Sequence, residues 1–179
     1  MIQLPEPLFR GRSSALMVSE MVRTRDEHED LGYEGHHAGY EKVGAYFVPP
    51  FQRPAVWSPE QQRRLVESLH LNISIGSIVV TGSNDADPVT GRAAITCELL
   101  IDGQQRLRAL TAYMHSGLRI FLGTPYEHCW DELDVTQQRL FRSKPVGYIE
   151  IEEGDMETLR ELYNRLNFGG TAHTEDQRA

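Results

Sequence analysis

One junction in this sequence constrains the fold more than any other feature: an apolar run ends in Asp-Gly, and an amphipathic segment follows at once. Residues 93–101 have the aliphatic and β-branched content of a buried strand. Beyond Asp102 and Gly103, apolar residues recur at helical spacing as far as Gly117. The residues expected on the buried helix face are Leu107, Leu110 and Met114. The sequence therefore predicts a strand, a glycine turn and a helix in immediate succession.

Further strands and helices are predicted on both sides of the junction. Ser58, Pro59 and Gln61 carry the capping signature of a helix start. Other helices are expected within residues 129–145 and over residues 155–167, and strands at Tyr46–Val48, Ser77–Thr81, 118–122 and 146–151. The strand at Ser77–Thr81 should form a long-tipped hairpin with the strand that ends at the junction. This mixture predicts an α+β fold, with a small mixed β-sheet flanked by helices.

The N-terminal region follows a different pattern. Ser13 and Ser14 precede a short stretch of apolar residues at helical spacing, which predicts a short capped helix. Residues 24–44 are acidic and contain several glycines without a sustained period, which predicts a long loop. We therefore expect an N-terminal helix and an acidic, glycine-rich loop over residues 1–45, and one folded domain over residues 46–179.

Composition narrows the class of protein. The chain has 179 residues and a mass of 20.4 kDa, with 40% hydrophobic and 25% charged residues, which fits one globular domain. The sequence contains no run of about 18 apolar residues and no secretory signal, so we expect a cytoplasmic protein without a membrane segment. Cys97 and Cys129 are too few for a disulfide framework and lack the spacing of zinc ligands.

The charge balance argues against a protein that coats nucleic acid with a basic surface. The formal net charge is −8 and the isoelectric point is near 5.3. Only Lys42 and Lys144 are lysines, so arginine supplies nearly all of the positive charge. Because a planar guanidinium can hold a phosphate with two hydrogen bonds, a local basic site is still compatible with the sequence.

The junction is the first candidate site. A glycine at the start of a helix exposes backbone N–H groups and the positive end of the helix dipole, which together favour phosphate. Arg106 would lie near that helix start and could add a charged contact, and Asp102 could hold a magnesium ion carried by the phosphates. The alternative is structural, with Asp102 as the helix cap and Gln104 and Gln105 as exposed polar residues.

Two other segments could complete such a site. In the loop PPFQRPAVW, Gln52 and Arg53 are long polar residues held between prolines, whereas Phe51 and Trp57 are expected to belong to the core. In the segment NFGGT, Asn167 could bind a phosphate, a sugar hydroxyl or a metal, and the paired glycines would let the backbone approach a ligand. A helix C-cap explains the same segment without a ligand.

These segments occur together in a known family. The chain contains, in order, PPFQRPAVWSPEQQRRLVESL, IGSIVV, LLIDGQQRLRALTAY and LNFGGT, and this succession resembles the N-terminal domain family of GmrSD-type modification-dependent restriction endonucleases. The resemblance runs from about Tyr46 to the C-terminus, and DGQQR is its most specific motif. That family is related to the ParB and sulfiredoxin superfamily. The segment GQQRLRA also resembles the ParB box, in which a glycine and an arginine cradle nucleotide phosphates.

The resemblance implies nucleotide chemistry. It implies a single ParB/sulfiredoxin-like domain that binds a nucleoside triphosphate with Mg²⁺ and either hydrolyses it or transfers a phosphoryl group. Asp102, Arg106, Gln52 and Arg53 would be its catalytic residues, and Asp102 and Asn167 would hold the metal. The nucleotide-binding residues would be Gly76, Ser77, Gly103, Gln104, Gln105, Arg106, Asn167, Gly169, Gly170 and Thr171.

Three functional hypotheses follow. The first is a nucleoside triphosphatase in a DNA-related context of restriction, defence or phage biology. The second is a DNA-associated binding module in which arginines contact a phosphate backbone without turnover; these would be Arg53, Arg63, Arg64 and Arg106. The third is a phosphotransferase that acts on a small molecule or a modified base. The sequence ends before a nuclease domain of the restriction type, so we do not expect these residues alone to cleave DNA, and DNA or a separate nuclease is an expected partner.

Overall fold

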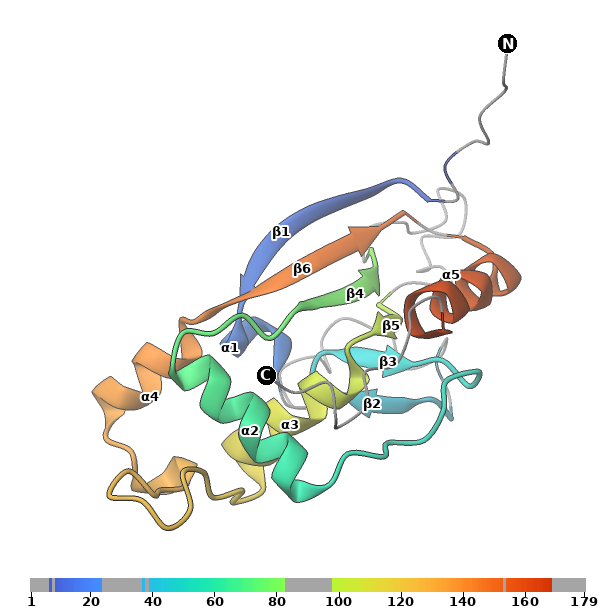
Figure 1. Cartoon of the computed structure of the whole chain (residues 1–179). Coiled ribbons are helices and arrows are strands. Elements are labelled where there is room, and N and C mark those ends of the chain that lie inside the picture. Colours follow the sequence, from blue (N-terminus) through green and yellow to red (C-terminus); the bar gives the residue numbers. More distant parts are fainter. Residues whose placement is uncertain are drawn as a thin grey trace, which may run out of the picture.

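A mixed sheet of four strands, in the order β1-β6-β4-β5, lies at the centre of the computed structural model (Figure 1). β4 and β6 run parallel, and β1 and β5 are antiparallel to their neighbours. The strands are β1 (Gly11–Met17), β4 (Ser77–Thr81), β5 (Leu100–Asp102) and β6 (Pro145–Ile151). The structure describes residues 7, 9–23, 37, 39–82, 98–152 and 154–168.

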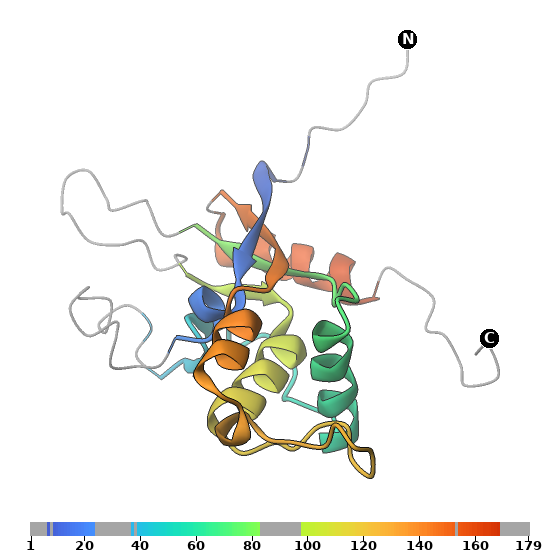
Figure 2. The same cartoon turned by 90° about the vertical axis from the view of Figure 1, so that its left-hand side faces the viewer.

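Helices cover the sheet as the sequence predicts for an α+β fold. α2, α3 and α4 lie together, and α5 lies apart from them (Figures 1 and 2). The helices are α1 (Val18–Met21), α2 (Pro59–His70), α3 (Gln104–His115), the 3₁₀ turn η4 (Trp130–Glu132), α4 (Val135–Arg142) and α5 (Met156–Phe168). In the part of the chain described, no helix combines the length and apolarity needed to cross a bilayer.

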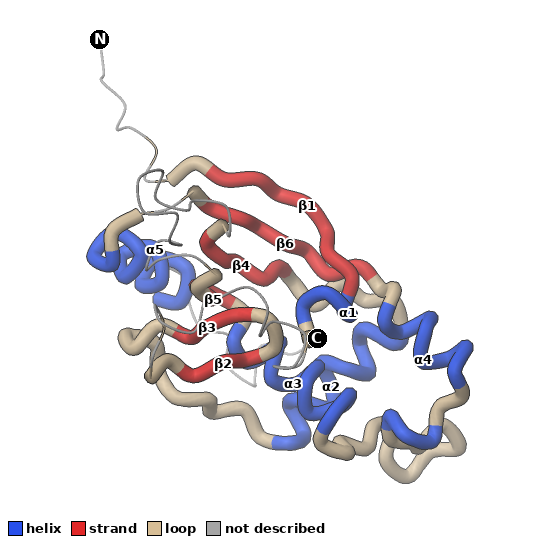
Figure 3. The backbone as a smooth tube through the Cα atoms, turned by 180° about the vertical axis from the view of Figure 1, so that it is seen from behind, coloured by secondary structure: helices blue, strands red, loops and turns tan. Residues whose placement is uncertain are grey.

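A two-stranded ribbon extends the structure beyond β5. β2 (Glu41–Val43) pairs antiparallel with β3 (Tyr46–Val48). The backbone N–H of Phe47 donates to the carbonyl of Glu98 at 3.0 Å, which places β3 beside the start of β5 (Figure 3). The chain that leaves β3 therefore begins next to the strand that carries the Asp-Gly junction.

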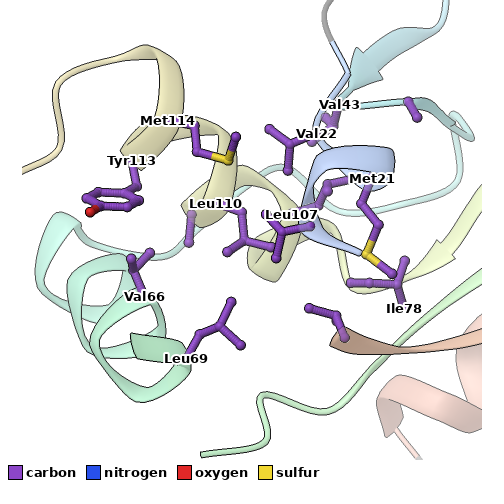
Figure 4. Packing of buried hydrophobic residues seen from close by; sticks show 14 of the residues in the cluster. Met21, Val22, Val43, Val66, Leu69, Ile78, Leu107, Leu110, Tyr113 and Met114 are labelled. Atoms are coloured by element: carbon purple, nitrogen blue, oxygen red, sulfur yellow. The ribbon is translucent and has the colours of Figure 1, made fainter. Parts of the chain in front are cut away.

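Side chains of the central strands alternate between two hydrophobic clusters, one on each face of the sheet. Ile78 and Leu100 pack in the larger cluster with residues of α1, α2 and α3, whereas Val79 and Ile101 pack with residues of α5. In the larger cluster, Leu107 and Leu110 of α3 lie between α2 and α1 (Figure 4); the labelled neighbours are Val66, Leu69 and Met21. Burial on both faces explains why consecutive residues are apolar in β4 (residues 78–80) and in β5 (residues 100–101).

Most predicted elements are confirmed, including the strands at Tyr46–Val48 and Ser77–Thr81 and the helix after Gly103. The start of α2 also has the predicted capping box. The hydroxyl of Ser58 accepts from the N–H of Gln61 at 3.3 Å, and the Gln61 side chain accepts from the N–H of Ser58 at 2.8 Å. The predicted hairpin is present as the antiparallel pair of β4 and β5, and its tip lies outside the described residues.

The helix predicted after Ser13 and Ser14 is wrong for most of its length. Both serines belong to β1, which pairs with β6 along its whole length, and only Val18–Met21 is helical. β1 is an edge strand whose side chains are mostly exposed, so alternating hydrophobicity does not mark it in the sequence. β1 and β2 thus both come from residues 1–45, where a helix and a loop are expected.

The structure also differs from two other predictions. The strand expected over residues 118–122 is reduced to a single bridge between Ile120 and His128. Of the long loop expected over residues 24–44, the end forms β2, and residues 24–36 and 38 lie outside the described part of the chain.

Candidate functional site

A pocket of about 140 Å³ lies where β5 ends and α3 begins. Three segments that are far apart in the sequence form it: the loop between β3 and α2, the first turn of α3, and the end of α5. Its lining residues are Gln52, Arg53, Trp57, Asp102, Gly103, Gln104, Gln105, Arg106, Tyr163 and Asn167. We call this set the α3 pocket.

Gly103 shapes the α3 pocket through its backbone. Its φ of 102° is left-handed, and a Cβ atom added there would come within 2.5 Å of the Cδ1 atom of Ile78. Gly103 is also the N-cap residue of α3, and no side chain caps that helix. The first N–H groups of an α-helix have no partner within the helix, so this start offers donors and a positive dipole end to a ligand.

Asp102 and Arg106 form an ion pair beside that helix start. Nη2 of Arg106 lies 2.7 Å from Oδ2 of Asp102 and donates to the carbonyl of Ser77 at 2.8 Å. The two side chains are 23% and 30% exposed for Arg106 and Asp102 respectively. Asp102 therefore pairs with Arg106 instead of capping α3, and Arg106 ties the first turn of α3 to β4 and β5.

The loop that carries Gln52 and Arg53 is fastened on two sides. Nε2 of Gln52 donates to the carbonyls of Leu100 and of Ile101, the latter at 3.3 Å. The backbone N–H of Arg53 donates to the hydroxyl of Tyr163 at 3.4 Å, while the Arg53 side chain is exposed. Gln52 thus fixes the loop on β5, which leaves the Arg53 guanidinium available to a ligand.

Two glutamines in the first turn of α3 bring side-chain amides to the α3 pocket. The side chain of Gln104 lines the pocket, is only 7% exposed, and makes no hydrogen bond to any described residue. Oε1 of Gln105 accepts from the backbone N–H of Trp57 at 3.3 Å, but the buried Nε2 of Gln105 has no partner in the described part of the protein. A buried polar group without a partner is costly, so a ligand that bonds Nε2 of Gln105 would stabilise the site.

The third predicted segment reaches the same pocket through Asn167. Its Nδ2 donates to the carbonyl of Tyr163 at 2.9 Å, and the residue lines the pocket from α5. Gly169, Gly170 and Thr171 lie outside the described residues.

Gly76 and Ser77 occupy a different place from the other predicted residues. Neither lines the α3 pocket; both lie beside Arg106. The carbonyl of Ser77 accepts from Arg106, and Gly76 lines a separate hollow of about 210 Å³. The structure thus assigns these two residues a position next to Arg106 and not in the pocket wall.

Two lining residues, Trp57 and Tyr163, are missed by the sequence analysis, which expects Trp57 in the core and does not single out Tyr163. Tyr163 does pack in the smaller cluster, and its ring lies 5.7 Å from that of Phe51, which packs against that cluster as expected. Trp57 belongs to neither cluster and is partly exposed, so its assignment to the core is wrong. Its position in the same proline-rich loop as Gln52 and Arg53 is the signal that could have identified it.

The charges around the pocket favour an anion. Its lining includes two guanidinium groups, of Arg53 and Arg106, and one carboxylate, of Asp102. Among the described residues, no cluster of three or more histidine, cysteine or acidic side chains could hold a metal ion. Mg²⁺ usually keeps one or two protein carboxylates and takes further oxygens from substrate phosphates. In the lining of the α3 pocket, Asp102 supplies the carboxylate that such an ion would need.

Comparison with known proteins identifies the family. The family model described as "GmrSD restriction endonuclease, N-terminal domain" matches residues 33–176, which include every residue of the α3 pocket. Searches of curated proteins and of solved structures find no match. Because the matched range covers most of the sequence, this chain belongs to the family of GmrSD restriction endonuclease N-terminal domains.

Proposed function

We propose that this domain binds a nucleoside triphosphate in the α3 pocket and, with Mg²⁺, hydrolyses it as part of a DNA-restriction system. One observation carries the proposal: the uncapped start of α3 opens into a pocket lined by two arginines and by Gln105, whose buried Nε2 has no partner in the described part of the protein. Backbone N–H groups and guanidinium groups are the usual ligands of phosphate in proteins.

The pocket gives its residues different roles. The phosphates would bind the N–H groups of the first turn of α3, with the Arg53 guanidinium and the Gln104 amide as further donors. Arg106 would keep α3 in place through Asp102 and Ser77 and add positive charge. Phosphoryl transfer depends mainly on positioning and on stabilising negative charge, which these groups would supply. A magnesium ion bound with the phosphates, held by Asp102 and Asn167, would neutralise further charge.

The biological context rests on family membership. The name of the family associates it with restriction endonucleases, which supports DNA or a partner nuclease as the companion of this domain. The likeness of GQQRLRA to the ParB box, with the arginine held next to the α3 start, supports nucleotide chemistry.

Calorimetry with a panel of nucleoside triphosphates and Mg²⁺, together with phosphate release, tests the proposal. We expect Arg53→Gln to weaken nucleotide binding by about 10- to 150-fold, the loss that a charge-assisted contact of about 1.5–3 kcal/mol predicts. The matched control is Arg64→Gln, an exposed arginine on α2 that pairs with Glu60 at 2.6 Å outside the pocket, and it should bind as the wild type does. Absence of binding by wild-type protein to every nucleotide would overturn the proposal.

Measurements of DNA binding and of γ-phosphate transfer on the same protein distinguish this function from its alternatives. A DNA-binding module without turnover would show DNA affinity that falls steeply with salt and does not respond to nucleotide. A phosphotransferase would move a labelled γ-phosphate to an acceptor, whereas a hydrolase would release it to water. Neither Arg63 nor Arg64 of α2 lines the α3 pocket, and Arg64 pairs with Glu60.

A further inference from the structure

We infer that Trp57 is the stacking platform for the nucleobase, and that it makes the α3 pocket select nucleotides over inorganic polyphosphates with little preference among bases. This inference rests on the proposed function and names the residue that would recognise the nucleoside part of the ligand.

Packing within the protein does not explain the position of Trp57. The residue is partly exposed and belongs to neither hydrophobic cluster. Its ring makes no aromatic or cation–π contact within the described residues. The other tryptophan, Trp130, is 6% exposed and packs in the core at 5.6 Å from the ring of Tyr113. One of the two indoles therefore stabilises the fold, and the other has apolar surface left for a partner.

Trp57 is held close to the proposed phosphate site. Its backbone N–H donates to Oε1 of Gln105, in the first turn of α3. The next residue, Ser58, caps α2, and Pro59 begins that helix. Since the backbone is fixed between two helix starts and an indole has only two side-chain torsions, little conformational entropy is lost when a base stacks on the ring.

The size of the pocket places the base outside its enclosed part. A volume of about 140 Å³ is below the range of about 300–1,000 Å³ typical of pockets that enclose a whole small molecule. The phosphates would occupy this volume, and the sugar and base would extend over the lining residues that reach solvent. Tyr163 is 6% exposed and packs in the smaller cluster, so Trp57 is the lining aromatic residue with accessible surface in the described structure.

Stacking on an indole explains why the site would tolerate different bases. Every base has a π-face, so an aromatic platform distinguishes a nucleotide from a polyphosphate but discriminates weakly among the bases. Removal of one stacking ring is expected to weaken nucleotide binding by about 5- to 150-fold, from about 1–3 kcal/mol per stacked base.

The test compares nucleotide with inorganic tripolyphosphate. Binding of ATP, GTP, CTP, UTP and tripolyphosphate, each with Mg²⁺, is measured by calorimetry on wild type, Trp57→Ala and Trp57→Phe. The backbone N–H that bonds Gln105 remains in both variants. Val56→Ala is the matched control, because Val56 is the neighbouring residue, is 60% exposed and does not line the pocket. Thermal unfolding of each variant verifies that it is folded.

We expect Trp57→Ala to lose affinity for nucleotides and not for tripolyphosphate. Trp57→Ala should lose affinity for all four nucleotides by a similar factor and keep the affinity for tripolyphosphate, while Trp57→Phe should recover most of the loss and Val56→Ala should behave as wild type. If Trp57→Ala binds nucleotides as wild type does, or loses tripolyphosphate equally, the inference is overturned and the proposed function stands. If wild type binds neither nucleotide nor tripolyphosphate, both are overturned.

Discussion

Gln104 is the residue at which a binding role can be separated from a structural role. It lines the α3 pocket from the first turn of α3 and is 7% exposed. No hydrogen bond joins its side chain to a described residue, and its amide is not among the fully buried polar atoms that lack a partner, as Nε2 of Gln105 is. The amide can therefore be replaced without breaking a hydrogen bond within the described part of the protein.

We predict that Gln104→Leu leaves the free energy of unfolding unchanged or slightly raised and weakens nucleotide binding by about 3- to 10-fold, the value of one hydrogen bond. Leucine is close to glutamine in size and has no polar group to leave unpaired. Urea unfolding and calorimetry on the same preparation measure both quantities. A loss of stability with unchanged affinity would show that the amide supports the fold.

Gly103 carries a backbone requirement that no other residue type meets. We predict that Gly103→Ala destabilises the protein by about 2–4 kcal/mol, because a left-handed φ and a collision with Ile78 act together. The control is Gly117→Ala, which has a φ of 69° and no neighbouring atom within 4 Å of the added Cβ. Denaturant unfolding of both variants separates the two effects; equal losses would contradict the predicted collision.

At the scale of elements, α2 connects the fold to the candidate site. Its N-cap, Ser58, directly follows Trp57, so the helix start and the position of the indole share one stretch of backbone. We predict that Ser58→Ala lowers the free energy of unfolding by about 1 kcal/mol, because an orphan N–H loses its acceptor.

The matched control for this cap is Ser68→Ala. Ser68 lies on the same helix, and its hydroxyl donates to the carbonyl of Arg64 at 2.7 Å, a carbonyl that also belongs to the helical backbone. The free energy of unfolding of Ser68→Ala should stay within about 0.5 kcal/mol of that of wild type, because the hydrogen bond that is lost is exposed to solvent. If Ser58→Ala and Ser68→Ala lower the free energy of unfolding by the same amount, the capping interaction contributes no specific stability.

Elements could be predicted from the sequence where the signal is local. The start of α2 is specified by Ser58, Pro59 and Gln61 within four consecutive residues, and the turn before α3 by a single glycine. β1 could not be predicted, because its stability comes from pairing with β6, more than 120 residues away, and not from its own composition. Propensity and periodicity rules use only residues that are near in sequence, so they do not detect a pairing partner that is far away.

The candidate site shows the same limit. Asp102, Gly103 and Arg106 could be found because one motif contains them, and Gln52, Arg53 and Asn167 because each stands out in its own segment. The hydrogen bonds that join these segments could not be found, since Gln52 reaches the carbonyls of β5 and Trp57 reaches Gln105 only after folding. The convergence of three segments on one pocket is a property of the tertiary structure.

At the scale of the whole molecule, α3 links the pocket to a buried aromatic cluster. The helix begins at the pocket and near its end carries Tyr113, whose hydroxyl lies 2.9 Å from Nε2 of His128 and 3.1 Å from Nε2 of His70. His70 ends α2, and its ring also packs at 4.6 Å from that of Phe141. Two helices that start at the site thus end at a common cluster of rings.

That cluster makes the stability of the whole molecule depend on pH. Burial, together with the smaller effects of the nearby His128 and Lys144, lowers the pKa of His70 from 6.5 to about 4. Since the pKa of His70 is lower in the folded than in the unfolded state, the unfolded chain takes up the proton first as pH falls. The stability that neutral His70 gives is therefore fully present above about pH 6.5 and is lost progressively toward pH 4.

We predict that the melting temperature of wild type falls more steeply between pH 6.5 and pH 4 than that of His70→Gln. Glutamine can still bond the Tyr113 hydroxyl but does not take up a proton in this range, so the difference between the two curves isolates the imidazole. Groups that do not interact with His70 titrate equally in both proteins and cancel in that difference. Parallel curves would mean that His70 is protonated as readily in the folded protein as in the unfolded chain, and the packing around its ring would then be looser than the ring distances indicate.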